Sequence, residues 1–151
     1  SLDLHPGDSL GRLHVADPNG ALELIDVLWR RLARRYADYP DDRLFLELLN
    51  EPVVDAKIWN AQAARLISTV RAESPGRTLI FGPANFQRIE ALLELVPFPD
   101  PNIVYAAHFY DPMIFTHQGL DWSDDPLRHL QGVPFPTDRA DSRIVQLLSA
   151  V

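Results

Sequence analysis

Short apolar segments alternate with amphipathic segments along this chain. The apolar runs at residues 44–49, 78–81 and 102–107 have the length and composition of parallel strands, and the first is apolar enough for a strand buried on both faces. Residues 21–36 and 58–70 carry apolar side chains at intervals of three and four, which predicts helices. This alternation predicts an α/β fold with right-handed crossovers and a parallel sheet, either doubly wound or closed into a barrel.

The segments around these elements are predicted in the same way. Residues 1–5 alternate like the end of a strand, and residues 6–20 are expected to form a loop in which Asp17 begins the next helix. A shorter helix is expected at residues 87–95, and residues 111–139 are expected to form a long functional loop. The residues expected on the inner side of the shorter helix are Ile89, Leu92 and Leu93.

The length and charge of the chain restrict its fold and its partners. At 151 residues it is one domain or part of one, and too short for a complete eight-stranded barrel of about 250 residues. A net charge of −7 argues against nucleic acid or an anionic membrane as a partner. The absence of cysteine excludes disulfides and thiolate metal sites, and the first residues show neither an initiator Met nor a signal peptide.

Polar residues follow each predicted strand. Because the carboxyl ends of parallel strands meet at one edge of a sheet, these side chains are expected to form a polar pocket for a ligand. The residues expected to line it are His5, Asn50, Glu51, Asn85, His108 and Tyr110.

Glu51 is the strongest candidate for catalysis. A carboxyl group at the mouth of an apolar strand is partly desolvated, which lets it donate a proton near neutrality. Taken as a bare tripeptide, however, Asn50-Glu51-Pro52 also fits a strand-end turn with a solvated glutamate. The tripeptide alone leaves both interpretations open.

The wider sequence resembles family 5 of the glycoside hydrolases, which are cellulase-like retaining enzymes. Residues 44–52, Leu-Phe-Leu-Glu-Leu-Leu-Asn-Glu-Pro, resemble the signature of the family's fourth strand. Residues 2–5 resemble the end of its third strand, residues 103–112 resemble its sixth, and residues 115–122 resemble the loop that follows. The resemblance implies that residues 1–151 are an incomplete catalytic domain, a partial TIM (β/α)8 barrel with parallel strands alternating with helices.

The resemblance also implies roles for the residues at the strand ends. Glu51 would protonate the leaving glycosidic oxygen and then activate water, and Asn50 would contact the hydroxyl next to the anomeric carbon. His5 and His108 would line the cleavage subsite, and Tyr110 would orient the nucleophilic carboxylate. The ligand would be an oligo- or polysaccharide, with no cofactor and no metal, and the location would be secreted or periplasmic.

The remaining aromatic, histidine and arginine side chains have separate expected roles. Trp122 is expected to stack on a sugar ring, whereas Trp59 is expected in the core and Phe86 fits either role. The arginines within residues 30–35 are expected on a solvated helix face. The histidines whose spacing suggests no metal site, and which are expected in loops, are His14, His117 and His129.

A retaining glycosidase needs a second carboxylate about 5 to 5.5 Å from the first. Glu47 precedes Glu51 by four residues, roughly 13 Å along a strand, and the other candidate glutamates fall on predicted helices. In the family the nucleophile follows the seventh strand, so this chain is expected to be a fragment whose partner is the remainder of the barrel. The alternatives are a catalytically inactive carbohydrate-binding remnant or subunit, and a doubly wound enzyme. The latter would need a glycine-rich phosphate loop that this sequence lacks.

Overall fold

A four-stranded parallel sheet forms the centre of the first part of the molecule. The computed structural model describes residues 1–121 and 126–135, and the chain divides into two compact units, Ser1–Ala107 and a second that begins at His108. The sheet lies in the first unit, and every pair of neighbouring strands is parallel. Its strands are β1 (Leu2–Asp3), β2 (Leu46–Glu47), β3 (Leu79–Phe81) and β4 (Ile103–Tyr105). The predicted strands and their parallel pairing are therefore confirmed.

The order of the strands separates the two arrangements that the sequence left open. The strands are neighbours in the order β1-β2-β3-β4, with no reversal among the described residues. A doubly wound sheet reverses its order at a switch point so that helices cover both faces. Sequential parallel strands with right-handed crossovers place the helices on one face, as in an arc of a barrel.

The prediction that residues 44–49 form a strand buried on both faces is wrong. Leu46 and Leu48 are completely buried, whereas Phe45 is exposed and Glu47 is half-buried. Alternate side chains of a strand point to opposite faces, so the face of β2 that carries Leu46 packs under the helices, whereas the face that carries Glu47 is only partly covered, with Leu49 buried beyond the strand. The neighbouring strand β3 follows the same pattern, since Leu79 and Phe81 are buried on either side of a half-buried Ile80.

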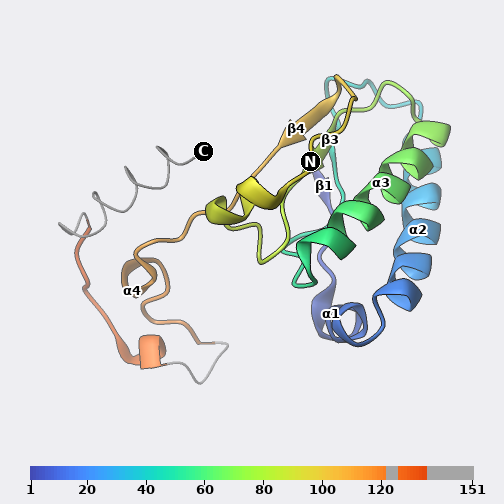
Figure 1. The fold of residues 1–151 in the computed structure, drawn as a ribbon. Helices are drawn as coiled ribbons and strands as arrows, with labels where there is room; N and C mark the ends of the chain where they lie inside the picture. The colour runs from blue at the N-terminus through green and yellow to red at the C-terminus, as the bar shows by residue number, and fades with distance from the viewer. Residues whose placement is uncertain (122–125, 136–151) are drawn as a thin grey trace. The chain divides into compact units, whose positions relative to one another are not determined.

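Two long helices cover the packed face of the sheet. Helix α2 (Pro18–Arg35) and helix α3 (Ala56–Glu73) lie side by side (Figure 1). The Asp17 carboxylate caps α2 by accepting a hydrogen bond from the Gly20 N–H at 3.0 Å, which confirms the predicted start of this helix. The buried apolar residues of α2 recur at intervals of three and four, as the pattern predicted: Ala21, Leu22, Ile25, Trp29 and Ala33.

Two indole groups connect these helices to the ends of the strands. The Trp29 indole of α2 donates to the Leu48 carbonyl at 2.8 Å, and the Trp59 indole of α3 donates to the Gly82 carbonyl at 2.8 Å. Both rings are almost completely buried, so each bond satisfies a polar group that has no access to water. The carboxyl ends of β2 and β3 are thereby held to the helical layer.

The expected loop at residues 6–20 is instead largely a helix, α1 (Gly7–Ala16). Its apolar pattern is weak because its buried residue is polar. The His14 Nε2 atom lies 2.6 Å from the side-chain amide oxygen of Gln62 on α3. Pro6 caps the helix without a side-chain hydrogen bond, so no capping signal marks its start. His14, expected in a loop, therefore belongs to the packing between α1 and α3.

The short helix expected at residues 87–95 is a 3₁₀ helix, η1 (Ile89–Glu94). Ala91 is its buried residue, whereas Leu93, expected inside, is 69% exposed. A 3₁₀ helix has three residues per turn. The prediction assumed the 3.6 residues per turn of an α-helix and therefore placed Leu93 on the buried face instead of the exposed one.

A buried arginine holds the segment that leads into β2. The Arg77 guanidinium is inaccessible to solvent, and it lies 3.4 Å from the Asp41 carboxylate. It donates hydrogen bonds of 2.8 to 3.1 Å to the backbone carbonyls of Tyr36, Tyr39, Pro40 and Leu44. The carbonyls at the end of α2 and in the following loop are therefore satisfied by one side chain.

A second arginine holds the segment before β4. The Arg71 guanidinium on α3 binds both oxygens of Asp100, at 2.7 and 3.1 Å, and also donates to the Arg77 carbonyl at 2.6 Å. The hydrogen bond from Arg71 lowers the pKa of Asp100, and this effect outweighs the desolvation that acts in the opposite direction. Asp100 therefore binds a proton less readily in the folded state than in the unfolded chain.

The second unit contains short helices within the region predicted to be a long loop. These are α4 (Met113–Thr116) and the 3₁₀ helix η2 (Pro126–His129), and a cis peptide bond joins Asp111 to Pro112. The side chain of Gln118 connects the unit by binding the backbone of Val133 through both its oxygen and its nitrogen. In the part of the chain that the structure describes, no helix is long and apolar enough to cross a membrane.

We expect Arg77→Leu to lower the free energy of unfolding by about 3 kcal/mol, because it removes four hydrogen bonds from a buried guanidinium to backbone carbonyls, of which, among the described residues, only those of Tyr36 and Pro40 keep a backbone donor. Urea unfolding followed by circular dichroism measures this change. The matched control is Arg43→Leu, which removes an exposed guanidinium from the same region and should change stability by less than about 0.5 kcal/mol. A loss below about 1 kcal/mol for Arg77→Leu would mean that water replaces the guanidinium.

We also expect the ion pair of Arg71 and Asp100 to contribute to acid sensitivity. Because the pKa of Asp100 is lowered in the folded state, its stabilisation is present above the ordinary aspartate pKa of about 4 and is lost as the pH falls through the folded value. Asp100→Asn should therefore flatten the dependence of unfolding free energy on pH below about pH 5. Arg71→Met should flatten it similarly, and an unchanged slope in both variants would contradict the assignment.

Candidate active site

The carboxyl ends of β1 and β2 are joined by their backbones. The Asn50 N–H donates to the Leu4 carbonyl at 2.9 Å, which places the residues after the two strands next to each other. The His5 side chain, 69% exposed, lies with its Nε2 atom 2.7 Å from an oxygen of Asp3. His5 is therefore an accessible, carboxylate-paired histidine, and Asn50 beside this segment is half-buried.

Glu51 follows directly in an uncommon backbone conformation. Its φ of 49° lies in the left-handed region, which costs a residue other than glycine roughly 1 kcal/mol or more. Its N–H donates to the side-chain oxygen of Gln87 at 2.8 Å, and the residue is half-buried. The backbone therefore leaves extended geometry after β2, and the strongest catalytic candidate of the sequence lies at this irregular position.

The loop after β3 contains three consecutive residues with the same left-handed conformation. Asn85, Phe86 and Gln87 have φ values of 56°, 62° and 54°. The Phe86 N–H donates to the Pro52 carbonyl at 3.2 Å, so the loop is attached to the segment that carries Glu51. Asn85 is exposed on this loop, which brings the ends of β2 and β3 together as predicted.

Gln87 is the residue of this region that sequence reasoning missed. The apolar pattern places it at the start of a helix, but it lies before that helix and is completely buried. Its oxygen accepts from the Glu51 N–H, and its nitrogen donates to the Glu47 carboxylate at 3.2 Å. The sequence feature that relates to Gln87 is Gly82, whose missing side chain leaves room for the Gln87 amide. No sequence pattern links a glycine to a glutamine five residues later.

His108 and Tyr110 belong to the second unit and are described within it. Their ring centroids lie 6.0 Å apart with the rings nearly perpendicular. The Tyr110 ring also packs edge-on against His117, and its carbonyl accepts a hydrogen bond from the Thr116 hydroxyl at 2.6 Å. The two residues therefore form one aromatic group, whereas Trp122 lies outside the described residues.

The other aromatic candidates differ in their exposure. Trp59 is buried in the core, as expected, and its ring packs against Phe81. Phe86 is 50% exposed on the loop after β3. Phe86 is thus an accessible aromatic face beside the strand ends, while Trp59 supports the strand end from below.

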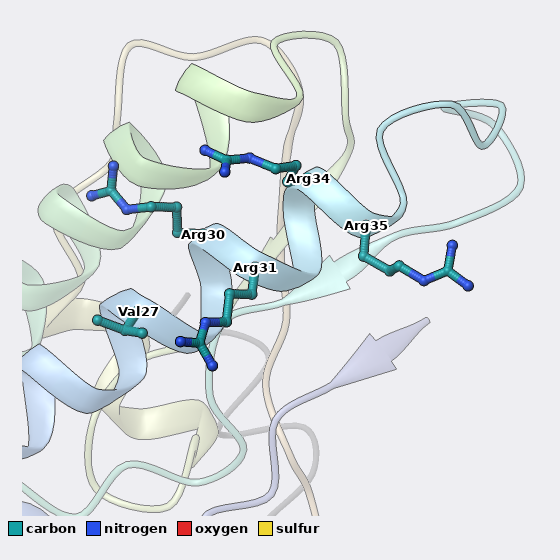
Figure 2. A pocket seen from close by; sticks show the side chains of 5 residues that line it. All are labelled: Val27, Arg30, Arg31, Arg34 and Arg35. Atoms are coloured by element: carbon teal, nitrogen blue, oxygen red, sulfur yellow. The ribbon is translucent and has the colours of Figure 1, made fainter.

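A surface pocket lies elsewhere, along the outer side of α2. Figure 2 shows that its arginine side chains extend in different directions instead of converging on one point. Arg30 lies 3.4 Å from Asp26, and Arg34 lies 2.7 Å from Glu73. The pocket is lined by Val27, Arg30, Arg31, Arg34 and Arg35, which matches the predicted solvated face. It lies away from the strand ends and carries none of the candidate catalytic groups.

Comparison with known protein families identifies relatives over nearly the whole chain. Residues 2–140 match the sequence profile of the family Cellulase (glycosyl hydrolase family 5). Endoglucanase 3 of Fibrobacter succinogenes is 37% identical over an alignment of 145 residues that covers 92% of this chain and 22% of that protein. Endoglucanase C of Acetivibrio thermocellus is 36% identical over 121 residues, which are 80% of this chain and 35% of that protein.

Solved structures show the same fold over a larger protein. Thermotoga maritima Cel5A in complex with cellobiose matches 98% of this chain and 47% of that chain, with a TM-score of 0.84 and 29% identity. Its complex with mannotriose gives a TM-score of 0.83 and 28% identity. The predicted fold class, a partial TIM barrel, is therefore confirmed, and the chain spans about half the length of these solved chains.

We expect Phe86→Gly to preserve or raise stability, by up to about 1 kcal/mol, because glycine adopts the left-handed conformation without strain and little buried surface is lost. Thermal unfolding measures the change. Val104→Gly is the control, since Val104 is 51% exposed but lies on β4, where glycine should destabilise by about 1 kcal/mol. Equal destabilisation by both substitutions would contradict the strain at Phe86.

Proposed function

The chain belongs to glycosyl hydrolase family 5, and we propose on that basis that it forms the part of a retaining endoglucanase that carries the acid/base catalyst, Glu51. The substrate is a β-linked polysaccharide, cleaved by double displacement. Residues 1–151 are then one section of the catalytic domain of a longer protein.

The position of Glu51 is the observation that carries this proposal. It is half-buried and lies four residues after the end of β2, at the edge of the sheet where α/β barrels bind their substrates. Its own N–H donates to Gln87, and the backbone on either side of it is held by the bond from Asn50 to Leu4 and by the bond from Phe86 to Pro52. A half-buried glutamate with a fixed backbone at this edge suits proton transfer to a bound substrate.

The chemistry of this carboxyl group has two stages. In the first, Glu51 gives its proton to the glycosidic oxygen while the bond from that oxygen to the anomeric carbon breaks and the nucleophilic carboxylate bonds to the carbon. In the second, the Glu51 carboxylate takes a proton from water, whose oxygen displaces the enzyme carboxylate from the anomeric carbon. One residue thus serves as acid and then as base.

The remaining polar and aromatic residues are assigned to the substrate. Asn50 contacts the hydroxyl next to the anomeric carbon, and Tyr110 orients the nucleophilic carboxylate. The exposure of the His5 side chain and of Asn85 supports a role in contacting sugar hydroxyls. The full set assigned to substrate binding is His5, Asn50, Asn85, His108, Tyr110 and Trp122.

We assign the nucleophile to a residue of the longer protein outside residues 1–151. Among the described residues, Glu47 already accepts a hydrogen bond from Gln87, and it is the last residue of β2, four residues before Glu51. Glu23 and Glu73 are bound to arginines on the helical layer, away from the strand ends. None of these three suits a carboxylate facing Glu51 across a sugar ring.

The relatives guide the choice of substrate. Two of them are named endoglucanases, and Cel5A has been solved with cellobiose and with mannotriose. We therefore assign this chain to a protein that cleaves within β-linked glucan chains. Loops set the preference among related polysaccharides.

We expect the full-length protein that contains this chain to hydrolyse carboxymethyl-cellulose, and Glu51→Gln to lower kcat by about 10²- to 10⁴-fold. Glutamine keeps the shape of the side chain but cannot transfer a proton. Release of reducing sugar ends measures the rate.

Glu94→Gln is the matched control, because it makes the same chemical change at an exposed residue of η1. It should leave kcat unchanged. Hydrolysis by Glu51→Gln at the rate of the unmodified protein would overturn the role of Glu51. Binding of the polysaccharide without hydrolysis by the unmodified protein would favour a catalytically inactive carbohydrate-binding protein instead.

A further inference from the structure

We propose that Gln87 is a positioning residue for Glu51, acting through the backbone of the acid/base catalyst. This inference rests on the proposed role of Glu51. Gln87 is completely buried, lies on the loop after β3, and contacts the segment of β2 at two points. It does not need to touch the substrate to influence the reaction.

The two hydrogen bonds of Gln87 fix its amide in one orientation. The Glu51 N–H can only donate, so it requires the amide oxygen, at 2.8 Å. The Glu47 carboxylate accepts, so it requires the amide nitrogen, at 3.2 Å. Reversal of the amide would break both contacts at once, which is why the side chain serves as a rigid connection between Glu47 and Glu51.

Gln87 continues the connection between β2 and β3 beyond their ladder. The Leu48 N–H donates to the Ile80 carbonyl at 3.2 Å, but Glu51, three residues further, donates to a side chain instead. This bond fixes the peptide plane before the Glu51 side chain, at the residue whose φ is 49°. Loss of this hydrogen bond makes the left-handed conformation of Glu51 less stable. The carboxyl group can then turn away from the glycosidic oxygen.

The surroundings of Gln87 are built to hold it there. A Cβ atom on Gly82 would overlap the amide nitrogen of Gln87 and lie 2.7 Å from its Cγ, so only glycine leaves room for this side chain. The Gly82 carbonyl in turn accepts the hydrogen bond from the buried indole of Trp59. A continuous series of contacts therefore runs from α3 through Gly82 and Gln87 to the backbone of Glu51.

The test compares two substrates in the full-length protein. A cellooligosaccharide needs its leaving oxygen protonated, whereas 2,4-dinitrophenyl cellobioside releases an acidic phenol that leaves without a proton. We expect Gln87→Leu to lower kcat/KM about 10- to 100-fold for the oligosaccharide and less than about threefold for the aryl glycoside. A purely structural loss would lower both values by the same factor, and that result would overturn the inference, as would no loss at all.

A second pair of variants keeps the test decisive if Gln87→Leu does not fold. Gln87→Glu retains an acceptor for the Glu51 N–H but sets two carboxylates against each other at Glu47, so the selective loss should appear. Adding Glu47→Gln supplies an amide donor to the new carboxylate and should restore oligosaccharide hydrolysis to within about threefold of the unmodified protein. A double variant no better than Gln87→Glu would overturn the inference.

The variant Glu51→Gln separates this inference from the proposed function. It should show the same dependence on the leaving group, and more strongly. If Glu51→Gln shows no such dependence, the acid/base assignment fails and the positioning role fails with it. If Glu51→Gln shows it and the Gln87 variants do not, only the role of Gln87 is overturned.

Discussion

The hydrogen bonds from two buried indoles to the carbonyls at the strand ends are the contacts on which the candidate site depends. Trp29 holds the Leu48 carbonyl and Trp59 holds the Gly82 carbonyl. Each ring also fills the apolar space between helix and sheet. The same side chain therefore both packs the core and fixes the position of a strand end. Because β2 and β3 end at fixed points, the residues that follow them can leave regular geometry without disturbing the sheet.

Irregular backbone is concentrated where those strands end. Glu51 and residues 85–87 are the residues other than glycine that have positive φ in the described part of the chain. Such conformations persist only where neighbouring contacts enforce them, and here the bonds between Glu51 and Gln87 and between Phe86 and Pro52 do so. In TIM barrels this end of the strands carries the active site, and strained backbone is common where side chains must be oriented toward a ligand.

Elements whose buried residues recur at regular intervals could be predicted from the sequence. Features that depend on a contact with a residue distant in the sequence could not. The strands, the two long helices and the Asp17 cap follow from local patterns, and so do the residues at the strand ends. Helix α1 was missed because its buried residue is His14, which is stable there only beside Gln62. Gln87 was missed for the same reason, because nothing local to residue 87 indicates a donor and an acceptor contributed by the segment of β2.

Charged groups that stabilise the unit gather before the strands, and candidate catalytic groups gather after them. Arg77 precedes β3 and binds carbonyls of the segment that leads into β2, and Arg71 holds Asp100 before β4. Asn50, Glu51 and Gln87 instead follow strands. The groups bound by these two arginines therefore lie before the strands, at the opposite end from the residue to which the proton transfer is assigned. The side chains that hold the segments entering β2 and β4 are thus different from those that hold the segment of Glu51.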